Sequence, residues 1–316
     1  MDRMILKDSE RKLKDMFGDR LITNHPLARL NTFGTGGPAR LFYEAGTADE
    51  LASIVKASEE LDFPTFLLGG GSNLLVSDDG YEGLVIKNSI KGIERRGTEI
   101  FCGAGEDLQS VVDFATENGL SGLEFATGIY GTVGGAIFGN AGAYGSETGS
   151  ILVSAQLVDR QGNIRTERQP YFEFGYRDSI LKRTGEIVAT ANFALEMGKK
   201  DIIQSKCDEI RTQRENKLPN NAYTAGCFFK NIPDKNEKFG KLSAGKLLDE
   251  VGAKNISFKG ACVFAKHANI LINDGSACSD DIRRLAKLLK EKVKDKFDIE
   301  LTEEITLLGK FEEENI

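Results

Sequence analysis

The chain has 316 residues, of which 41 are Lys or Arg and 48 are Asp or Glu, so its net charge at pH 7 is −7. A chain of this length can bury a sizeable core, and we expect two or three domains. The acidic balance and the lack of a long basic run argue against a nucleic-acid or membrane-surface partner. A few local cations could still hold an anionic small ligand.

Targeting and metal signals are absent from the sequence. Residues 1–20 are charged and lack the apolar region of a signal peptide, and no apolar run approaches the roughly 18 residues that span a bilayer. We therefore expect a cytoplasmic protein. The five cysteines are widely spaced and contain no Cys-x-x-Cys pair, which argues against a disulfide framework or a zinc site. With His25 and His267 as the two histidines, we expect no metal centre.

The first part of the chain leads to a glycine triplet. A short charged helix is expected at Ser9–Phe17, and a second helix begins at the capping box Thr47-x-x-Glu50. A buried strand at Thr65–Leu68 then runs directly into Gly69-Gly-Gly-Ser-Asn-Leu74. The free amides and small donors of this loop suit a pyrophosphate. No Lys-Ser/Thr pair follows, so the loop is not that of a nucleotide hydrolase.

The middle of the chain mixes strands and helices. Strands are expected at 84–86, 100–102, 151–159, 163–167 and 186–195, with turns at Gly97 and Gln161-Gly162, and a helix at Asp107–Asn118 that ends at Gly119. Because these elements follow no clean βαβ rhythm, we expect an α+β fold.

A glycine-rich stretch, Gly119–Gly149, follows that helix. Glycine at this density is typical of backbone that approaches another group closely or adopts a positive φ. Ile129, Val133 and Ile137 lie among the glycines, so the segment is packed rather than a flexible linker. Its exposed amides either face a bound cofactor or form a tightly wound structural turn.

Two nucleotide-binding patterns occur in the sequence and are discounted. Gly34–Ala39 matches Gly-x-Gly-x-x-Ala, but no strand precedes it and Pro38 lies inside it. Gly240–Leu247 is one residue short of a Walker A motif, because Leu247 stands where a hydroxyl would hold Mg²⁺.

The last part of the chain is expected to form a separate domain. Helices are expected at 202–216 and 243–251, and Ser279 is expected to cap a third. The final strand is expected at 299–308 and contains Glu303 and Glu304. These two side chains would face opposite sides of a strand, so only one could enter a site.

Several side chains are candidates for chemistry, each with a plainer alternative. Cys227 is either a buried small apolar residue or a proton donor. Arg177 either pairs with Asp178 at the surface or clamps a carboxylate. Cations and donors that could hold a phosphorylated ligand, but that individually are more often solvent-facing, are Lys217, Lys230, Asn231, Lys266 and His267.

Motifs in a fixed order run through most of the chain. They are Asn31-Thr-Phe-Gly-x-Gly-Gly-Pro-Ala39, Gly69-Gly-Gly-Ser-Asn-Leu74, Gly122-Leu-Glu-Phe125, Gly131-Thr-Val-Gly-Gly-Ala136, Asn140-Ala-Gly-Ala-Tyr-Gly145, Phe174-Gly-Tyr-Arg-x-Ser179, Ala225-Gly-x-Phe-Phe-Lys-Asn231, Ala244-Gly-Lys-Leu247 and Lys266-His-Ala268. Each is weak alone, but their joint order and spacing are specific. The chain closely resembles the UDP-N-acetylenolpyruvoylglucosamine reductases, flavoenzymes of peptidoglycan precursor synthesis.

The resemblance implies a two-lobed FAD-binding domain of the vanillyl-alcohol-oxidase/p-cresol-methylhydroxylase type, followed by a C-terminal α+β substrate domain. On this basis we expect an N-terminal helical extension at 1–20, the FAD-binding domain at 21–200 with lobes at about 21–80 and 81–200, and the substrate-binding domain at 201–316. The chain lacks the longer insertions of one subtype, so it is similar to the shorter, type II-like one.

The resemblance also implies non-covalent FAD, and the sequence offers no histidine on the glycine-rich stretch for a covalent link. The triplet Gly69–Gly71 with Ser72 and Asn73 would cradle the pyrophosphate, and the loop Thr127–Gly135 would lie along the flavin. The residues that the resemblance assigns to FAD are Asn31, Thr32, Leu68, Gly69, Gly70, Gly71, Ser72, Asn73, Thr127, Gly128, Gly131, Thr132, Gly134, Gly135, Ala136, Asn140, Ala141 and Gly142.

In the family's mechanism NADPH reduces FAD and leaves, and the enolpyruvyl ether of UDP-N-acetylglucosamine then binds. Hydride goes to the terminal vinyl carbon, charge accumulates on the carboxylate as an enolate, and an acid protonates the neighbouring carbon to give UDP-N-acetylmuramate. The resemblance assigns Arg177 and Glu304 to polarising the carboxylate and Cys227 to proton donation. Substrate contacts are expected from Tyr176, Lys217 and Asn231.

This chain departs from the family pattern at three positions. The family's acid is usually Ser, whereas a thiol stands at Cys227; a thiol is the more acidic donor and is oxidisable. The family usually has Pro where Tyr130 and Glu303 stand. Loss of Pro at position 130 relaxes a rigid turn beside the flavin.

Two other functions fit part of the pattern: an FAD-dependent oxidase or dehydrogenase of the same fold acting on another small molecule, and a non-catalytic nucleotide-sugar-binding protein. The set Arg177, Cys227 and Glu304 argues against the second, since a binder needs no acid. We therefore expect an NADPH-dependent oxidoreductase, a UDP-N-acetylmuramate dehydrogenase, with roles in cell-wall synthesis, cell shape, the cell cycle and division. Its expected partners are small molecules, with no nucleic acid, membrane or protein partner.

Overall fold

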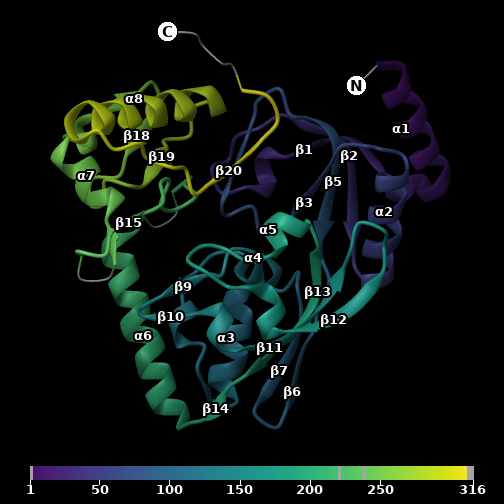
Figure 1. The fold of residues 1–316 in the computed structure, drawn as a ribbon, viewed down its shortest axis with the longest axis horizontal. Helices are drawn as coiled ribbons and strands as arrows, with labels where there is room; N and C mark the ends of the chain where they lie inside the picture. Colours follow the sequence, from purple (N-terminus) through teal and green to yellow (C-terminus); the bar gives the residue numbers. More distant parts are fainter. Residues whose placement is uncertain (1–2, 220–221, 238–239, 312–316) are drawn as a thin grey trace. The chain divides into compact units, whose positions relative to one another are not determined.

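The structure of the protein is a computed structural model that describes residues 3–219, 222–237 and 240–311. The chain divides into two compact units (Figure 1). The first comprises Met1–Thr23, Leu41–Gly70 and Gly83–Arg214, and the second comprises Asn24–Arg40, Gly71–Glu82 and Glu215–Ile316. Each unit therefore draws on segments that lie far apart in the sequence.

A four-stranded sheet in the order β1-β2-β5-β3 lies mainly in one half of the first unit, while residues 24–26, 38–40 and 81–82 of its strands are assigned to the second unit. Its strands are β1 (Ile22–Pro26), β2 (Pro38–Ala45), β5 (Tyr81–Asn88) and β3 (Thr65–Leu68). The predicted strand β3 is confirmed, and it runs parallel to β5 with Thr65 opposite Leu84. This pairing holds the glycine triplet that follows β3 at the edge of the sheet.

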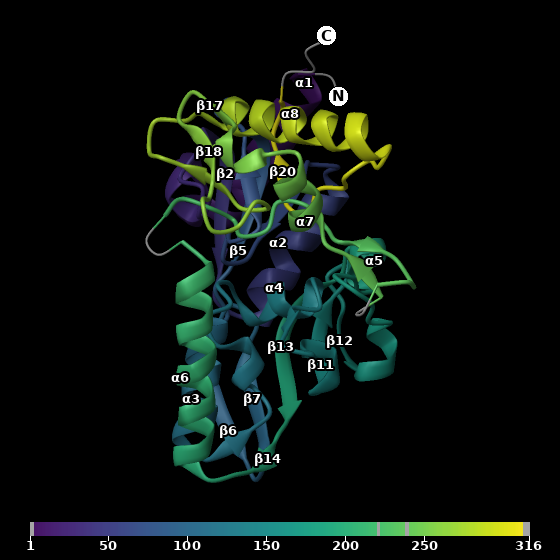
Figure 2. The same ribbon diagram turned by 90° about the vertical axis from the view of Figure 1, so that its left-hand side faces the viewer.

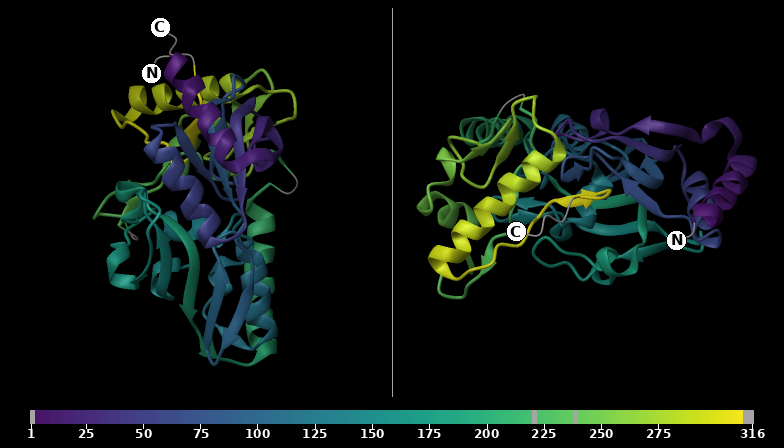
Figure 3. Two further views of the ribbon diagram at one scale, coloured as in Figure 1. Left: turned by 90° about the vertical axis from the view of Figure 1, so that its right-hand side faces the viewer. Right: turned by 90° about the horizontal axis from the view of Figure 1, so that it is seen from above.

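Two helices cover the core of this half. They are α1 (Arg3–Phe17), drawn in purple in Figure 3, and α2 (Ala48–Glu60). The hydroxyl of Ser9 on α1 donates to the carbonyl of Leu61 at 3.0 Å, just beyond α2. The Thr47 hydroxyl accepts from the Glu50 amide at 3.2 Å, so the predicted start of α2 is confirmed. The buried residues between the helices and the sheet include Leu13, Leu41, Tyr43, Leu51, Ile54, Leu84 and Ile86.

The other half of the first unit is built on a five-stranded sheet in the order β12-β11-β13-β7-β6. Its strands are β12 (Ile164–Arg168), β11 (Leu152–Val158), β13 (Ile187–Ala194), β7 (Glu99–Gly103) and β6 (Ile93–Arg96). All neighbouring pairs are antiparallel. The predicted hairpin around Gln161-Gly162 is confirmed as β11 and β12, whereas β6 was not predicted.

Helices α3 (Leu108–Glu117), α4 (Val133–Phe138) and α6 (Lys200–Lys217) complete this half. Figures 1 and 2 show α6 beside α3, where the hydroxyl of Thr116 lies 3.7 Å from the sulfur of Cys207. Shorter elements are β8 (Leu120–Ser121), η3 (Glu124–Ala126), β9 (Gly142–Ala143), β10 (Ser146–Glu147), η4 (Thr148–Ser150), η5 (Gln169–Phe172), α5 (Leu181–Thr184) and β14 (Glu196–Met197).

The second unit packs its helices on small sheets. Its strands are β4 (Leu74–Val76), β15 (Ile232–Pro233), β16 (Lys241–Leu242), β17 (Ser257–Phe258), β18 (Ala261–Val263), β19 (Leu271–Asn273) and β20 (Thr306–Leu308). Its helical elements are η2 (Ala28–Leu30), α7 (Ala244–Glu250), η6 (Ala253–Asn255) and α8 (Ser279–Phe297). Helix α8, drawn in yellow in Figure 3, packs on the sheet β17-β18-β19. Together these elements confirm the α+β class.

Two predictions in the second unit are wrong. The N-cap of α8 is Cys278, whereas Ser279 was predicted. Ser279 is the first residue of the helix, and its hydroxyl donates to the Asp78 carboxylate at 2.7 Å. The long final strand predicted at 299–308 is also shorter than expected, since only Thr306–Leu308 forms a regular strand. Residues 302–304 bond to the segment around Phe228 instead, whereas β20 runs parallel to β4. This change of partner interrupts the strand.

Within the described ranges 3–219, 222–237 and 240–311, no helix is both long and apolar enough to cross a membrane.

Candidate functional site

In the first unit, the two glycine-rich loops predicted to hold FAD lie against each other. A Cβ atom added at Gly70 would lie 2.8 Å from the Cα of Gly131, and one added at Gly69 would lie 2.8 Å from the hydroxyl of Thr132. The amino group of Lys87, on β5, donates to the Gly69 carbonyl. Burial lowers the pKa of Lys87. Glycine is thus required where the loops touch, and side chains of other residues would separate them.

In the second unit, Gly71 lies against the Asn31-Thr32 loop. Gly71 has φ +66°, and an added Cβ would lie 2.0 Å from the Leu30 carbonyl oxygen. The Thr32 amide donates to the Gly71 carbonyl at 3.1 Å. The conformation and the close contact both demand glycine at this position.

Both units leave buried polar atoms of these loops without a hydrogen-bond partner among the described residues. They are Asn31 Oδ1, Thr32 Oγ1, Thr35 Oγ1 and Thr127 Oγ1. The Asn31 amide nitrogen donates to the carbonyls of Leu27 and Thr35 at 2.9 and 2.8 Å, so its oxygen is oriented by those bonds. Buried polar groups in proteins are normally satisfied. A polar cofactor such as FAD would provide hydrogen-bond partners for such oxygens, which lie in loops where close backbone contacts require glycine.

The predicted flavin loop Thr127–Gly135 is held from two helices. The side chain of Gln109, on α3, accepts from the Gly128 amide at 2.7 Å. The guanidinium of Arg214, near the end of α6, lies 3.0 Å from the position of a Cβ at Gly128, which has φ +71°. Sequence reasoning did not select Arg214, although it predicted the helix, because no motif marks that last turn.

Arg177 lies at the tip of a two-residue turn in the first unit. Gly175 and Asp178 exchange two backbone hydrogen bonds, at 3.1 and 3.2 Å, and leave Tyr176 and Arg177 between them. Arg177 has φ +54°, which is uncommon for a residue other than glycine. Its guanidinium donates to the Gly142 carbonyl at 3.4 Å and lies 5.8 Å from the Tyr176 ring centroid. Such strained residues often occur at functional sites.

The glycine-rich stretch is tied to this turn by buried side chains. The Asn140 amide donates to the Gly175 carbonyl at 2.9 Å, while its oxygen accepts from the Gly149 amide at 3.0 Å. The Ser179 hydroxyl donates to the Phe138 carbonyl at 2.8 Å. Asn140, predicted to contact FAD, therefore uses its carboxamide to bond the protein backbone.

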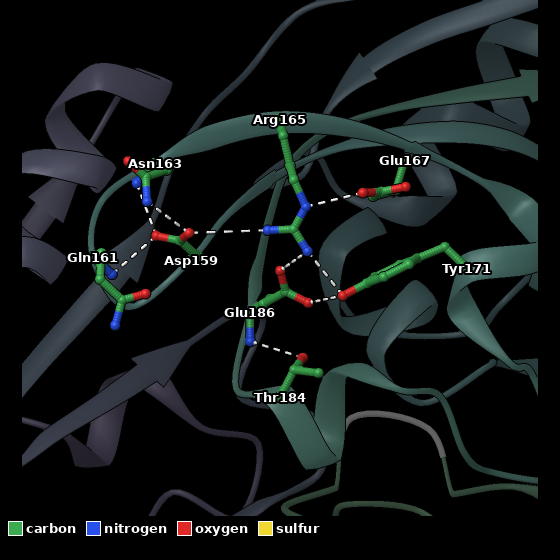
Figure 4. Close-up of polar contacts among 8 residues, drawn as sticks. All are labelled: Asp159, Gln161, Asn163, Arg165, Glu167, Tyr171, Thr184 and Glu186. Atoms are coloured by element: carbon green, nitrogen blue, oxygen red, sulfur yellow. Dashed lines mark hydrogen bonds and ion pairs between the residues drawn. The ribbon is translucent and has the colours of Figure 1, made fainter.

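A polar cluster holds the segment that leads into the turn (Figure 4). Arg165 on β12 donates to the Tyr171 hydroxyl at 2.9 Å and pairs with Glu186, to which Tyr171 also donates. The bond to Glu186 raises the pKa of Tyr171. Arg165 also pairs with Glu167 at 2.9 Å. The cluster joins β12, η5 and the start of β13, and so fixes both ends of the stretch that carries Arg177.

In the second unit, Cys227 and Glu304 lie on neighbouring extended segments. Cys227 pairs with Ile270, and Phe229 pairs with Glu303, in isolated antiparallel bridges. The Glu304 amide donates to the Phe228 carbonyl at 2.8 Å. Both Cys227 and Glu304 are half-buried. The structure thus brings together two of the three predicted catalytic residues, from positions far apart in the sequence, and places Arg177 in the first unit.

The remaining predicted residues have simpler environments. Lys217 is exposed at the end of α6, and Tyr176 is 38% exposed. The side-chain oxygen of Asn231 accepts from the Ala244 amide at 3.1 Å, at the start of α7. The side chain of Asn73 donates to the Glu304 carbonyl at 3.0 Å, which links the glycine-triplet loop to the segment of Glu304. In the part of the chain that the structure describes, no group of three or more His, Cys, Asp or Glu residues could hold a metal ion.

Two protein-family models match the chain. The model of an FAD binding domain matches residues 39–167, and that of the C-terminal domain of UDP-N-acetylenolpyruvoylglucosamine reductase matches residues 218–308. These matches confirm the expected FAD-binding domain and the resemblance of the C-terminal region.

Several relatives match this chain over nearly the whole length of both sequences. The UDP-N-acetylenolpyruvoylglucosamine reductase of Caldanaerobacter subterraneus subsp. tengcongensis is 37% identical over 300 residues, which cover 94% of this chain and 97% of that protein. That of Clostridium novyi is 35% identical over 310 residues, covering 98% of each. The crystal structure of UDP-N-acetylenolpyruvylglucosamine reductase from Thermus caldophilus superposes with a TM-score of 0.77 at 31% identity, over 92% of this chain and 98% of that one.

Proposed function

The chain belongs to the UDP-N-acetylenolpyruvoylglucosamine reductase family, and we propose that it reduces the enolpyruvyl ether of UDP-N-acetylglucosamine to UDP-N-acetylmuramate. The observation that carries this proposal is a match at 37% identity that spans 94% of the chain and 97% of the relative. The match therefore includes both the FAD-binding and the C-terminal regions of a complete enzyme.

Bound FAD would supply the hydride chemistry of the reaction, with NADPH as the hydride source and the terminal vinyl carbon of the substrate as the acceptor. In the first unit, the loops around Gly70 and Gly131 would hold the cofactor. In the second unit, the loop from Asn31 to Thr35 carries further residues that the resemblance assigns to FAD. The support for this assignment is the glycine-only contacts together with the unsatisfied oxygens of Asn31, Thr32 and Thr127. We propose FAD binding by residues 21–200 and substrate binding by residues 201–316. The compact units follow other bounds, because segments 24–40 and 71–82 belong to the second unit and the first extends to Arg214.

The protein's own groups would supply charge and a proton. Arg177, oriented by its tight turn, would bind the carboxylate of the enolpyruvyl group and stabilise negative charge as it develops. Glu304 would act on the same carboxylate. Cys227 Sγ–H would give its proton to the carbon that bears the ether oxygen, and the thiolate would regain a proton from water. One hydride and one proton thus add across the double bond. Tyr176, Lys217 and Asn231 would contact the sugar nucleotide.

The cellular setting follows from this reaction. We propose that the enzyme works in the cytoplasm, where it supplies a peptidoglycan precursor and thereby supports cell shape, the cell cycle and division. Its proposed partners are NADPH and the sugar nucleotide, with no protein partner required.

An anaerobic titration in two steps tests the proposal. The purified protein, loaded with FAD, should lose its flavin absorbance on addition of NADPH and recover it on addition of the enolpyruvyl sugar nucleotide, with UDP-N-acetylmuramate as the product. Protein that takes up no FAD would overturn the proposal. Recovery with oxygen or another acceptor, but not with the sugar nucleotide, would instead assign the chain to a flavin oxidase or dehydrogenase.

A further inference from the structure

The side chain of Asn269 forms a hydrogen-bond ladder with the segment that carries Cys227. Its oxygen accepts from the Phe229 amide at 2.9 Å, and its nitrogen donates to the Phe229 carbonyl at 2.8 Å. The Asn269 backbone carbonyl also accepts from the Phe228 amide at 2.8 Å. Asn269 is 2% exposed, so these bonds are shielded from water. The carboxamide takes the place of the backbone groups that a continuous neighbouring strand would offer.

The opposite edge of the same segment is bonded to the residues around Glu304. The Phe228 carbonyl accepts from the Glu304 amide at 2.8 Å, and the Lys230 amide donates to the Thr302 carbonyl at 2.8 Å. Phe228 and Phe229 are themselves buried, at 0% and 1% exposed, so the segment is also held by packing. The segment of Cys227 therefore lies between two neighbours: the segment of Asn269 is bonded to one edge, and the segment of Glu304 is bonded to the other.

We propose that Asn269 is a positioning residue for proton delivery by Cys227, an inference that rests on the proposed function. Its carboxamide fixes the backbone of Phe229 and its main-chain carbonyl fixes that of Phe228, so Asn269 holds the two residues that follow Cys227 and thereby orients the thiol. Proton transfer requires the donor and acceptor atoms to lie within about 2.6–3.2 Å. A displacement of about 1 Å can lower a rate about 100-fold. Asn269 itself touches no reacting atom.

Replacement of Asn269 by Leu removes the side-chain hydrogen bonds and puts an apolar side chain of similar size in their place. We expect Asn269→Leu to slow reoxidation of the reduced flavin by the enolpyruvyl sugar nucleotide about 10- to 100-fold, with the rate of flavin reduction by NADPH unchanged. The solvent deuterium isotope effect on reoxidation should rise, because proton transfer becomes rate-limiting. Should Asn269→Leu fold poorly, Asn269→Gln keeps the carboxamide but shifts it by one methylene, and it should show a smaller loss of the same kind.

A double-mutant cycle separates positioning from general support of the fold. In a Cys227→Ala background no thiol remains to be positioned, so Asn269→Leu should cause less than a twofold further loss of reoxidation rate. Asn273, a buried asparagine on β19 whose amide donates to the Phe33 carbonyl at 3.0 Å, provides the matched control. Asn273→Leu should lower the melting temperature without raising the isotope effect.

Three outcomes would overturn the inference: losses that add fully in the Cys227→Ala background, equal slowing of both half-reactions by Asn269→Leu, or no slowing at all. One further result would contradict the proposed function itself. If Cys227→Ala alone turned over the substrate at the normal rate, Cys227 would not be the acid, and Asn269 would have nothing to position.

Discussion

Glu303 Oε1 accepts from Arg283 Nη1 at 2.7 Å, and this ion pair ties the segment before β20 to α8. The side chain of Glu303 is 19% exposed, so the pair is largely shielded. Of the two adjacent glutamates, one is therefore committed to a structural bond. The strand pattern alone does not decide which of them could enter a site, whereas the resemblance assigns Glu304. The ion pair gives Glu303 a structural role that is consistent with that assignment.

The two glutamates should consequently respond differently to the same substitution. We expect Glu304→Gln to slow reoxidation of the reduced flavin by the enolpyruvyl sugar nucleotide by about 10²- to 10³-fold, because charge at the carboxylate is lost from the site. Glu303→Gln should slow it less than about threefold while lowering stability, since Arg283 loses its partner. Stopped-flow measurement of both half-reactions checks this. Equal losses in the two variants would contradict it.

The thiol of Cys227 should matter to one half-reaction only. We expect Cys227→Ala to leave the reduction of FAD by NADPH intact and to slow enolpyruvate turnover by about 10²- to 10⁴-fold, the usual contribution of a general acid. Cys227→Ser should keep turnover, because a hydroxyl is the group that the family usually has at this position. If both half-reactions survive in the alanine variant, Cys227 is a packing residue.

Part of the candidate site could be proposed from the sequence because it lies in local motifs. The strand Thr65–Leu68 and the glycine triplet after it follow from hydrophobic pattern and composition, whereas the roles of Cys227 and Glu304 come from the resemblance to the family. The bonds of Asn269 and Arg283 could not be predicted, since each joins residues tens of positions apart with no local signature. Long-range pairing also explains the wrong final strand, because propensity at 299–308 does not reveal a change of partner at residue 305.

The predicted helix cap failed for a related reason. Serine is a preferred N-cap residue, yet the hydroxyl of Ser279 donates to Asp78, some 200 residues earlier in the chain. Arg214 illustrates the converse: its helix was predicted well, but the loop that its side chain contacts is set by tertiary structure. Local patterns thus identified elements, whereas the partners of individual polar side chains needed the fold.

Gly71 and Gly97 offer a matched pair for testing the cofactor loop. Both have a positive φ, at +66° and +65°, but an added Cβ at Gly71 would lie 2.0 Å from the Leu30 carbonyl oxygen, whereas one at Gly97 meets nothing within 4 Å. We expect Gly97→Ala to cost about 1–2 kcal/mol of stability through its backbone conformation alone. Gly71→Ala should cost more and should also weaken FAD binding at least 10-fold, because the Asn31 loop must move.

Thermal melting of the two variants, followed by fluorescence titration of the cofactor-free proteins with FAD, checks the prediction. The Gly97→Ala variant is the control for the cost of placing a side chain at a positive φ. Equal FAD affinities in the two variants would show that the contact between Gly71 and Leu30 has no bearing on the cofactor.

His267 should make stability depend on pH in a definite direction. Its Nδ1 accepts from the Asn269 amide at 3.3 Å, and burial lowers the pKa of its side chain below the usual 6.5. The unfolded chain therefore binds more protons than the folded chain at pH values between the lowered pKa and 6.5. Because the free energy of unfolding rises with pH wherever the unfolded state binds more protons, this contribution is complete above pH 6.5 and is lost as the pH falls through that window.

Replacement of His267 by Gln removes the titrating group. Urea unfolding at pH 7.5, 6.5 and 5.5 should show that the native protein loses more stability on acidification than His267→Gln does, and the difference between the two isolates this side chain from the carboxylates. The variant should also be less stable at pH 7.5 if glutamine cannot reproduce the bond to Asn269. Parallel pH dependences in the two proteins would mean that burial does not disfavour the charged imidazole. A steeper dependence in the variant would mean that folding raises the pKa of His267.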